Sequence, residues 1–195
     1  MDVGRILGLY AVGMFPMDEP GRPELPWWTA DPRTIFDLEG DAVAAVRRKV
    51  ARSVRVAERE GWELRLDEAF ELVVASCAQP RRAGDGVWLT GRMAALYEGL
   101  HDAGHAQSYE LWDGDALLAG VLAVRVGRAA MLESMFHVRP HAGNALLVRT
   151  LEALAAGGGQ LCDVQLSTPH LLRLGAQEVP RAEYERRLRQ AVRGM

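Results

Sequence analysis

The amino-acid sequence predicts an α+β fold in which helices pack on a central mixed sheet. Three observations lead to this prediction. Residues 107–135 alternate apolar and polar positions between turn signals, which is typical of a three-stranded antiparallel meander. Segments on both sides of it repeat apolar residues at helical spacing. A short apolar strand at 161–166 then lies between two of these helical segments.

The N-terminal segment combines a helix with irregular backbone. Apolar residues recur at helical spacing in residues 1–10, at Val3, Ile6, Leu7 and Tyr10. Five prolines and two glycines interrupt residues 13–33, so we expect no regular structure there. The large apolar side chains of this stretch are Phe15, Met17, Trp27 and Trp28. On irregular backbone they must either pack on another part of the chain or form a binding surface.

The remaining elements follow from periodicity and from helix start and stop signals. In chain order we expect a helix that begins near Asp41 and includes Arg52, a strand at 62–66, a helix at 70–77 capped by Asp67, an extended stretch at 87–90 and a helix at 93–100 that stops at Gly104. The meander follows, with its turns at Asp113-Gly114 and Gly127-Arg128. A helix over 147–154 ends at the glycines 157–159, and a helix at 184–192 follows the last strand.

The bulk composition is that of an ordinary globular protein. Of the 195 residues, 49% are apolar and 25% are charged, which suits one main domain with a small attachment. The net charge of −3 argues against a general nucleic-acid binder, because such proteins are usually basic. It still allows a local basic patch on the helix that begins near Asp41. The residues concerned are Arg47, Arg48, Lys49 and Arg52, and the alternative is an ordinary solvated helix face.

The sequence contains no signal for a membrane or a metal. No apolar run approaches the ~20 residues needed to span a bilayer, and the N-terminus has no signal-type apolar run. We therefore expect a cytoplasmic protein without a membrane partner. Neither Cys77 nor Cys162 belongs to a CxxC pair, so we expect two buried small side chains and no metal site.

Acidic residues interrupt two apolar strands, and these are the first candidates for a functional site. Glu133 interrupts the strand at 131–136. Asp163 and Gln165 are two positions apart, which on a strand places both side chains on the same face. Burial of an unpaired carboxylate is costly, so each acid needs a partner or a substrate. The alternative is a structural role, in which each acid is tied to a nearby arginine or to backbone amides.

A second motif is weaker. Residues 81–86, Arg81-Arg82-Ala83-Gly84-Asp85-Gly86, fit the loop with which many N-acetyltransferases hold the pyrophosphate of coenzyme A. Such a loop should follow a core strand and open a helix. Here it follows a helix and precedes an extended stretch, so we interpret the match as chance.

Short motifs occur in a fixed order along nearly the whole chain: Gly13-Met14-Phe15-Pro16, Trp27-Trp28, Asp31-Pro32-Arg33, Trp88-Leu89-Thr90, Ala95-Leu96-Tyr97, Glu133-Ser134-Met135-Phe136, Asp163-Val164-Gln165 and Val179-Pro180-Arg181. In this order they resemble the leucyl/phenylalanyl-tRNA–protein transferase family. The resemblance implies a small N-terminal domain at 1–38 and an N-acetyltransferase-like (GNAT-like) catalytic domain at 39–195, with helices flanking a central mixed sheet.

The resemblance also implies a reaction. The α-amine of a protein that begins with Arg or Lys attacks the ester joining Leu, Phe or Met to the 3′ adenosine of a tRNA, which tags that protein for degradation. An α-amine has a pKa of ~7.7–8.0 and is mostly protonated at pH 7, so a carboxylate is needed to accept its proton. The ester is already activated, so no metal or diffusible cofactor is expected.

Roles for individual residues follow from the resemblance. Asp163 would accept the proton, Gln165 would orient it or polarise the carbonyl, and Glu133 would position the amine. Family members often have Trp where this chain has Met17, and an aromatic residue where it has Ala130. The residues expected to bind the aminoacyl-adenosine are Trp88, Met135, Trp27, Trp28 and Ala130. Those expected to contact tRNA phosphates are Arg47, Arg48, Lys49 and Arg52.

Two rival functions stay open. The first is an acyl-CoA-dependent N-acyltransferase that uses residues 81–86, and it would bind coenzyme A and not aminoacyl-tRNA. The second is a non-catalytic adaptor that binds basic N-termini through Glu133 and Asp163 and turns over nothing.

Overall fold

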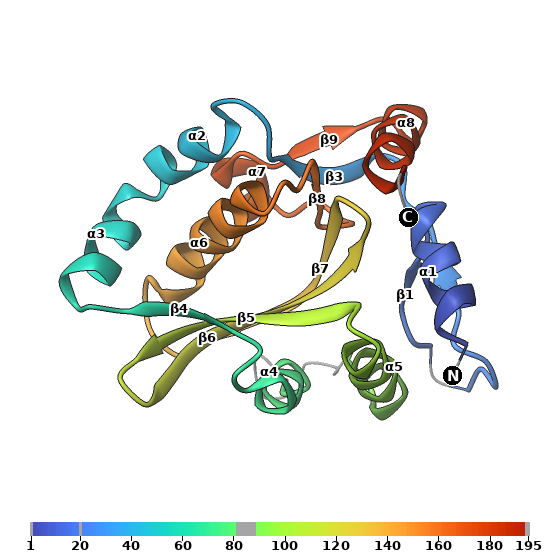
Figure 1. The fold of residues 1–195 in the computed structure, drawn as a ribbon, viewed down its shortest axis with the longest axis horizontal. Coiled ribbons are helices and arrows are strands. Elements are labelled where there is room, and N and C mark those ends of the chain that lie inside the picture. The colour runs from blue at the N-terminus through green and yellow to red at the C-terminus, as the bar shows by residue number, and fades with distance from the viewer. Residues whose placement is uncertain (1, 20, 81–88, 194–195) are drawn as a thin grey trace.

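The computed structural model describes residues 2–19, 21–80 and 89–193. In chain order its elements are α1 (Val3–Ala11), β1 (Phe15–Pro16), β2 (Trp27–Trp28), β3 (Arg33–Asp37), α2 (Ala42–Lys49), α3 (Ala51–Arg59), β4 (Glu63–Leu66), α4 (Phe70–Cys77), α5 (Gly91–Asp102), β5 (Ala106–Asp113), β6 (Ala116–Val126), β7 (Ala129–His137), α6 (Ala142–Ala156), β8 (Leu161–Asp163), α7 (Pro169–Leu174), β9 (Gln177–Val179) and α8 (Arg181–Val192). The main sheet has the order β4-β5-β6-β7-β8-β3-β9 (Figure 1). Only the β7–β8 pair in it is parallel, so the sheet is mixed as predicted.

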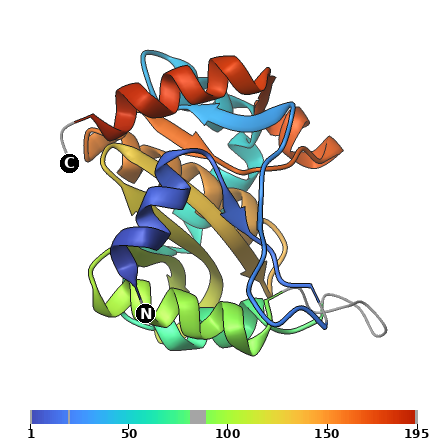
Figure 2. The same ribbon diagram turned by 90° about the vertical axis from the view of Figure 1, so that its right-hand side faces the viewer.

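Helices cover both faces of the sheet, and each face has its own apolar core. Helices α2, α3, α6 and α7 pack on one face, and α1, α4, α5 and α8 on the other. Successive strand residues alternate between the two cores; Val121 belongs to the first and Leu122 to the second. Figure 2 shows α1 between α8 and the α4–α5 pair. The predicted α+β class is therefore confirmed.

The antiparallel meander β5–β6–β7 also matches its prediction. Both turns contain a glycine with positive φ, Gly114 at 56° and Gly127 at 59°. Gly127 has a second reason to lack a side chain, because a Cβ there would lie 2.8 Å from the carbonyl oxygen of Ala191 in α8. The turn thus packs directly against the last helix.

Several local predictions were wrong. Asp67 does not cap α4: it adopts φ 55° and its Oδ1 accepts from the Ser108 backbone N–H at 2.6 Å, which ties the end of β4 to β5. The single helix predicted from Asp41 through Arg52 is divided at Val50 into α2 and α3. The strand predicted at 161–166 ends at Asp163. Strands β1 and β2 lie within residues 13–33, where no regular structure was expected. Strand β3, helix α7 and strand β9 were not predicted either.

The N-terminal segment is joined to the rest of the fold. Strand β3, which lies within residues 1–38, is hydrogen-bonded between β8 and β9. Tyr10 and Phe15 belong to the same apolar core as Tyr97 in α5 and Tyr184 in α8. The division into domains at residue 38 stays a prediction. No helix in the described part of the chain is long and apolar enough to cross a membrane.

Candidate active site

A cavity of about 160 Å³ lies where β7 and β8 part. The two strands pair only over Ala129–Met131 in β7. Beyond this point Glu133 of β7 forms one side of the cavity, and residues 164–166, which follow β8, form another. Strand β1 and the residue after it form a third side. The lining residues are Phe15, Pro16, Met17, Glu133, Val164, Gln165 and Leu166. Two of the three predicted catalytic residues, Glu133 and Gln165, therefore meet here.

Asp163 lies behind this cavity and is completely buried. Its carboxylate accepts from Nε and Nη2 of Arg33 at 2.9 and 2.6 Å, from the Tyr184 hydroxyl at 2.7 Å and from the Gln165 backbone N–H at 2.9 Å. A carboxylate has about four lone-pair sites, so these four hydrogen bonds occupy all the acceptor positions of Asp163. The carboxylate is thus held by the protein itself, and it does not face the cavity.

Gln165 does not share a strand face with Asp163, contrary to the prediction. Strand β8 has ended, and Gln165 adopts the left-handed conformation with φ 58°. When the side-chain amide nitrogen faces the carbonyl oxygens of Leu132 and Val164, it donates to both at 3.1 Å. In that orientation the amide oxygen is left to accept from a bound group. The two residues are still linked, because the backbone N–H of Gln165 donates to Asp163.

Glu133 is the carboxylate that faces the cavity. The register of β6 with β7 pairs Leu122 with Ser134 and Ala123 with Leu132, so Glu133 is the extra residue of a β-bulge. Bulges beside active sites commonly redirect a side chain in this way. Its Oε2 accepts from the Tyr97 hydroxyl at 3.1 Å. Its Oε1 is buried and has no hydrogen-bond partner among the described residues.

The environment of Glu133 changes its acidity. Burial raises the pKa of this carboxyl to about 8, although the nearby hydroxyls of Tyr10 and Tyr97 and the charge of Arg33 oppose the rise. Burial also raises the pKa of both tyrosines, so they stay protonated and can act as donors. Glu133 is therefore mostly protonated at pH 7, and it becomes available as a proton acceptor as the pH approaches 8.

Four residues of this region received no role from the sequence: Tyr10, Arg33, Tyr97 and Tyr184. Arg33 and Tyr97 lie within motifs that carried the family resemblance, but nothing in the sequence shows that Arg33 reaches Asp163. Tyr10 looked like an apolar position of a helix, and its buried hydroxyl has no partner among the described residues. A buried hydroxyl can be inferred only when the surrounding elements are in place.

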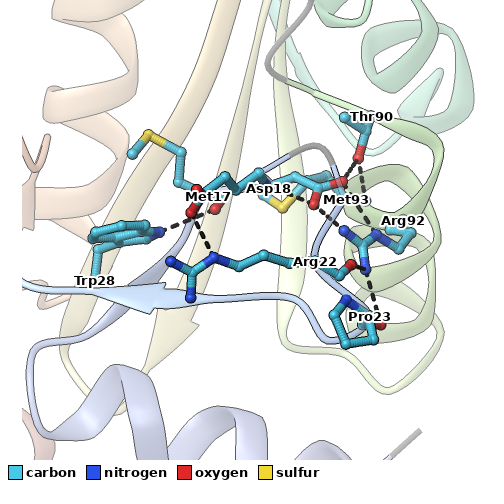
Figure 3. Close-up of polar contacts among 9 residues, drawn as sticks. Met17, Asp18, Arg22, Pro23, Trp28, Thr90, Arg92 and Met93 are labelled. Atoms are coloured by element: carbon cyan, nitrogen blue, oxygen red, sulfur yellow. Dashed lines mark hydrogen bonds and ion pairs between the residues drawn. The ribbon is translucent and has the colours of Figure 1, made fainter.

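The tryptophans of β2 support the cavity wall. Trp27 and Trp28 pair with Pro16 and Phe15 of β1, and neither is among the lining residues. The Trp28 indole N–H donates to the Met17 carbonyl oxygen at 3.1 Å (Figure 3). The ring of Trp27 meets Tyr10 edge-on, with ring centroids 5.3 Å apart. Their predicted stacking on the adenosine stays a prediction, and Trp88 lies outside the described residues.

The chain after Met17 is fastened to the start of α5. Asp18 pairs with the Arg92 guanidinium and accepts from the Thr90 hydroxyl, which also caps α5 (Figure 3). Arg92 donates in turn to the carbonyl oxygens of Arg22 and Pro23 at 2.9 and 3.1 Å. The hydrogen bonds from Arg92 and Thr90 lower the pKa of Asp18, so this connection stays charged at neutral pH.

Two other predicted binding residues lie away from the cavity. Ala130 is buried in the core on the α6 side of the sheet. Met135 comes after the bulge and packs against that same core. Neither is among the residues that line the cavity. No group of three or more His, Cys, Asp or Glu residues that could hold a metal occurs in the part of the chain that the structure describes.

The predicted basic patch is partly neutralised. Arg47 pairs with Glu58 and Glu152, and Arg48 pairs with Asp41. Lys49 and Arg52 are exposed and have no ion pair within the described residues. Arg52 lies on α3, which Figure 1 shows at the opposite end of the molecule from β1. A tRNA contact at Arg52 would therefore lie away from the β1 side of the cavity.

Comparison with known proteins decides the family. A sequence model described as leucyl/phenylalanyl-tRNA protein transferase matches residues 43–189. The chain belongs to this family. A leucyl/phenylalanyl-tRNA–protein transferase of Anaeromyxobacter sp. (strain K) is 42% identical over 96% of this chain and 78% of its own length. The enzyme of that name from Cereibacter sphaeroides (strain ATCC 17025 / ATH 2.4.3) is also 42% identical, over 97% of this chain and 84% of its own.

Solved structures show a related fold. FemX matches with a TM-score of 0.57 at 11% identity, over 91% of this chain and 66% of that structure. At this identity the likeness concerns the fold alone. The transferase family gives no support to the acyl-CoA alternative, and residues 81–86, on which that alternative rested, lie outside the described residues.

Proposed function

We propose that this transferase moves Leu or Phe, and also Met, from aminoacyl-tRNA to the α-amine of proteins that begin with Arg or Lys. The acceptor is thereby marked for degradation. The observation that carries the proposal is the pairing of Glu133 and Gln165 in one cavity of a chain that belongs to this family. We also propose that the protein is cytoplasmic and that its central sheet is N-acetyltransferase-like.

The reaction is the aminolysis of an ester. The amine nitrogen forms a bond to the carbonyl carbon, the bond from that carbon to the ribose oxygen breaks, and the ribose leaves as a hydroxyl. The amine attacks in its neutral form, and the pKa of its nitrogen falls as the bond to carbon forms. Glu133, with its pKa raised to about 8, is then a strong enough base to accept the proton that the nitrogen loses, and it can return this proton to the leaving ribose oxygen. We therefore assign the proton-accepting role to Glu133 in place of Asp163.

Gln165 positions the amine in this proposal. Its amide oxygen accepts one N–H of the incoming amine, while its nitrogen stays bound to Leu132 and Val164. Asp163 contributes through the backbone of Gln165. The function of Asp163 is thus one of support, and its charge is balanced by Arg33.

The apolar part of the cavity suits the donor side chain. An apolar cavity of roughly 150 Å³ holds a benzene molecule in an engineered protein. The cavity here, at about 160 Å³, accordingly suits the phenyl group of Phe or the isobutyl group of Leu. Its apolar lining residues are Phe15, Pro16, Met17, Val164 and Leu166.

A transfer experiment tests the reaction directly. We expect radiolabelled Leu and Phe to pass from charged tRNA to a model protein that starts with Arg, and not to an otherwise identical protein that starts with Ala. Binding of the Arg protein without transfer would point to the adaptor. Absence of transfer together with binding of coenzyme A would point to the acyltransferase.

The tRNA contact has its own test. If Lys49 and Arg52 contact phosphates, removing either charge should make the slope of log binding constant against log salt concentration shallower by about one. We expect this for Lys49→Ala and Arg52→Ala in binding titrations at several salt concentrations. Arg48→Ala is the matched control, since Arg48 is paired with Asp41. Unchanged slopes in both variants would place the tRNA on another surface.

A further inference from the structure

Two walls of the cavity come from distant parts of the chain. One wall is Phe15–Met17, and the other is Val164–Leu166. The first wall begins two residues after Gly13 and the second directly after Asp163, and Arg33 contacts both of these residues. Its Nη1 donates to the Gly13 carbonyl oxygen at 3.0 Å, and its Nε and Nη2 donate to Asp163.

The Arg33 side chain is enclosed on all sides. It is 1% exposed, and its guanidinium carbon lies 4.7 Å from the Phe15 ring centroid and 4.6 Å from that of Tyr184. Gly13 allows this packing, because a Cβ there would lie 2.8 Å from the Tyr184 ring. Burial would lower the pKa of Arg33, but the Asp163 carboxylate raises it above its usual value. The side chain is therefore a fixed, charged connection between the two walls.

Gln165 receives its conformation from this arrangement. Its N–H donates to Asp163, and its carbonyl oxygen accepts from Thr34 N–H at 3.1 Å, next to Arg33 on β3. The neighbouring Val164 N–H donates to the Thr34 carbonyl oxygen at 3.0 Å. A non-glycine residue in the left-handed region is held there by its surroundings. These contacts hold the side chain of Gln165 toward the cavity.

We propose that Arg33 is a positioning residue for aminoacyl transfer, acting with Asp163 and Tyr184 to hold Gln165 and the Phe15 wall in register. The proposal rests on the transferase function proposed above. A lysine cannot make the same contacts, because Arg33 uses three N–H groups of its planar guanidinium to donate to Asp163 and Gly13 at once. Displacement of a positioning group by about 1 Å can cost on the order of 10²-fold in rate.

A core ion pair with no positioning role makes a different prediction. Its loss would reduce the fraction of folded protein and leave the kcat of the folded molecules unchanged. Tyr184→Phe separates the two cases, because it keeps the ring against Arg33 and removes one hydroxyl from Asp163. Tyr109→Phe is the matched control: Tyr109 is similarly buried, and its hydroxyl contacts Arg125 at 3.5 Å.

The experiment compares Tyr184→Phe, Arg33→Lys and Tyr109→Phe by two measurements. The first is kcat and KM for transfer, per folded enzyme. The second is hydrogen exchange of the Gln165 backbone amide, followed by NMR without substrate. We expect Tyr184→Phe to lower kcat about tenfold with little change in KM, and to speed exchange at Gln165. Arg33→Lys should do more of both and also shift the amide signals of Phe15 and Met17. Tyr109→Phe should match wild type.

Each result has one meaning for the proposal. Wild-type kcat together with wild-type exchange at Gln165 in Tyr184→Phe would overturn it. Equal losses of kcat in Tyr184→Phe and Tyr109→Phe would do the same. If the wild-type protein transfers nothing, the proposed function fails, and the exchange at Gln165 still decides whether Arg33, Asp163 and Tyr184 hold this residue. If Arg33→Lys does not fold, Tyr184→Phe decides alone.

Discussion

Glu133→Gln is expected to lower the kcat of transfer by roughly 10²–10⁴-fold, the usual contribution of a general base. Glutamine has the same shape and can still accept from Tyr97, so the fold and the affinity for tRNA should persist. Single-turnover transfer to an Arg-starting protein measures the effect. Glu152→Gln is the control, because Glu152 makes an exposed pair with Arg47 far from the cavity. A variant within twofold of wild type would remove Glu133 from proton transfer.

The pH dependence of the same variant gives a second check. Both the amine and Glu133 must be unprotonated, so the wild-type rate should rise with pH to about 8, with a log slope approaching about two below pH 7. In Glu133→Gln only the amine titrates, and the slope should fall to about one. Identical pH profiles would contradict a titrating Glu133.

The free energy of unfolding of the wild type should fall as the pH rises, whereas its transfer rate rises. The folded pKa of Glu133 is raised from 4.5 to about 8, so the stability that the protonated form contributes is complete below pH 4.5 and is lost as pH rises to 8. We expect Glu133→Gln to be more stable than wild type at pH 8–9 by roughly 2–4 kcal/mol, with the gain fading toward pH 4.5. Urea unfolding across this range measures it. A constant difference would argue against a buried, titrating acid.

Asp163→Ala is expected to destabilise the fold by about 3–5 kcal/mol, because it leaves the buried Arg33 charge without its partner. Urea unfolding of Asp163→Ala beside Asp41→Ala measures the difference. The Asp41 pair with Arg48 is exposed, and its loss should cost less than about 1 kcal/mol.

A compensating variant tests the reason for this loss. Arg33→Met combined with Asp163→Leu removes both charges and should recover part of the stability, since a buried pair can often be replaced by apolar residues of similar volume. The recovery is partial because the Tyr184 hydroxyl and the Gln165 N–H lose their acceptor. The double variant should nevertheless transfer poorly, because Gln165 has lost the acceptor of its N–H. Wild-type stability of Asp163→Ala would mean that Arg33 finds another partner.

Local signals account for the part of the fold that could be predicted. The meander pairs strands that follow one another in the sequence, and its turns are indicated by Asp113-Gly114 and Gly127. Strand β3 was missed because its partners β8 and β9 lie far along the chain and its own five residues show no clear alternation. The helix cap at Asp67 failed for a similar reason, since Ser108 on β5 competes for that carboxylate.

The sequence predicted which residues belong to the site, but it did not predict how they are arranged. Glu133 and Asp163 were identified because each places a charge within an apolar strand, and burying an unpaired charge is costly. Which acid is free depends on Arg33, 130 residues from Asp163, and on the backbone of Gln165. Neither is visible in a local pattern. The alternation rule put Asp163 and Gln165 on one face because it assumed that the strand continued.

The way in which Arg33 joins Gly13 to Asp163 and Tyr184 affects how this enzyme is made. A nascent chain on the ribosome has its first wall, Phe15–Met17, long before Tyr184 is synthesised. Until α8 emerges, Arg33 lacks one of the two rings that enclose it, and Asp163 lacks a donor. The surroundings of Arg33 and Asp163 are therefore complete only after Tyr184 has been synthesised.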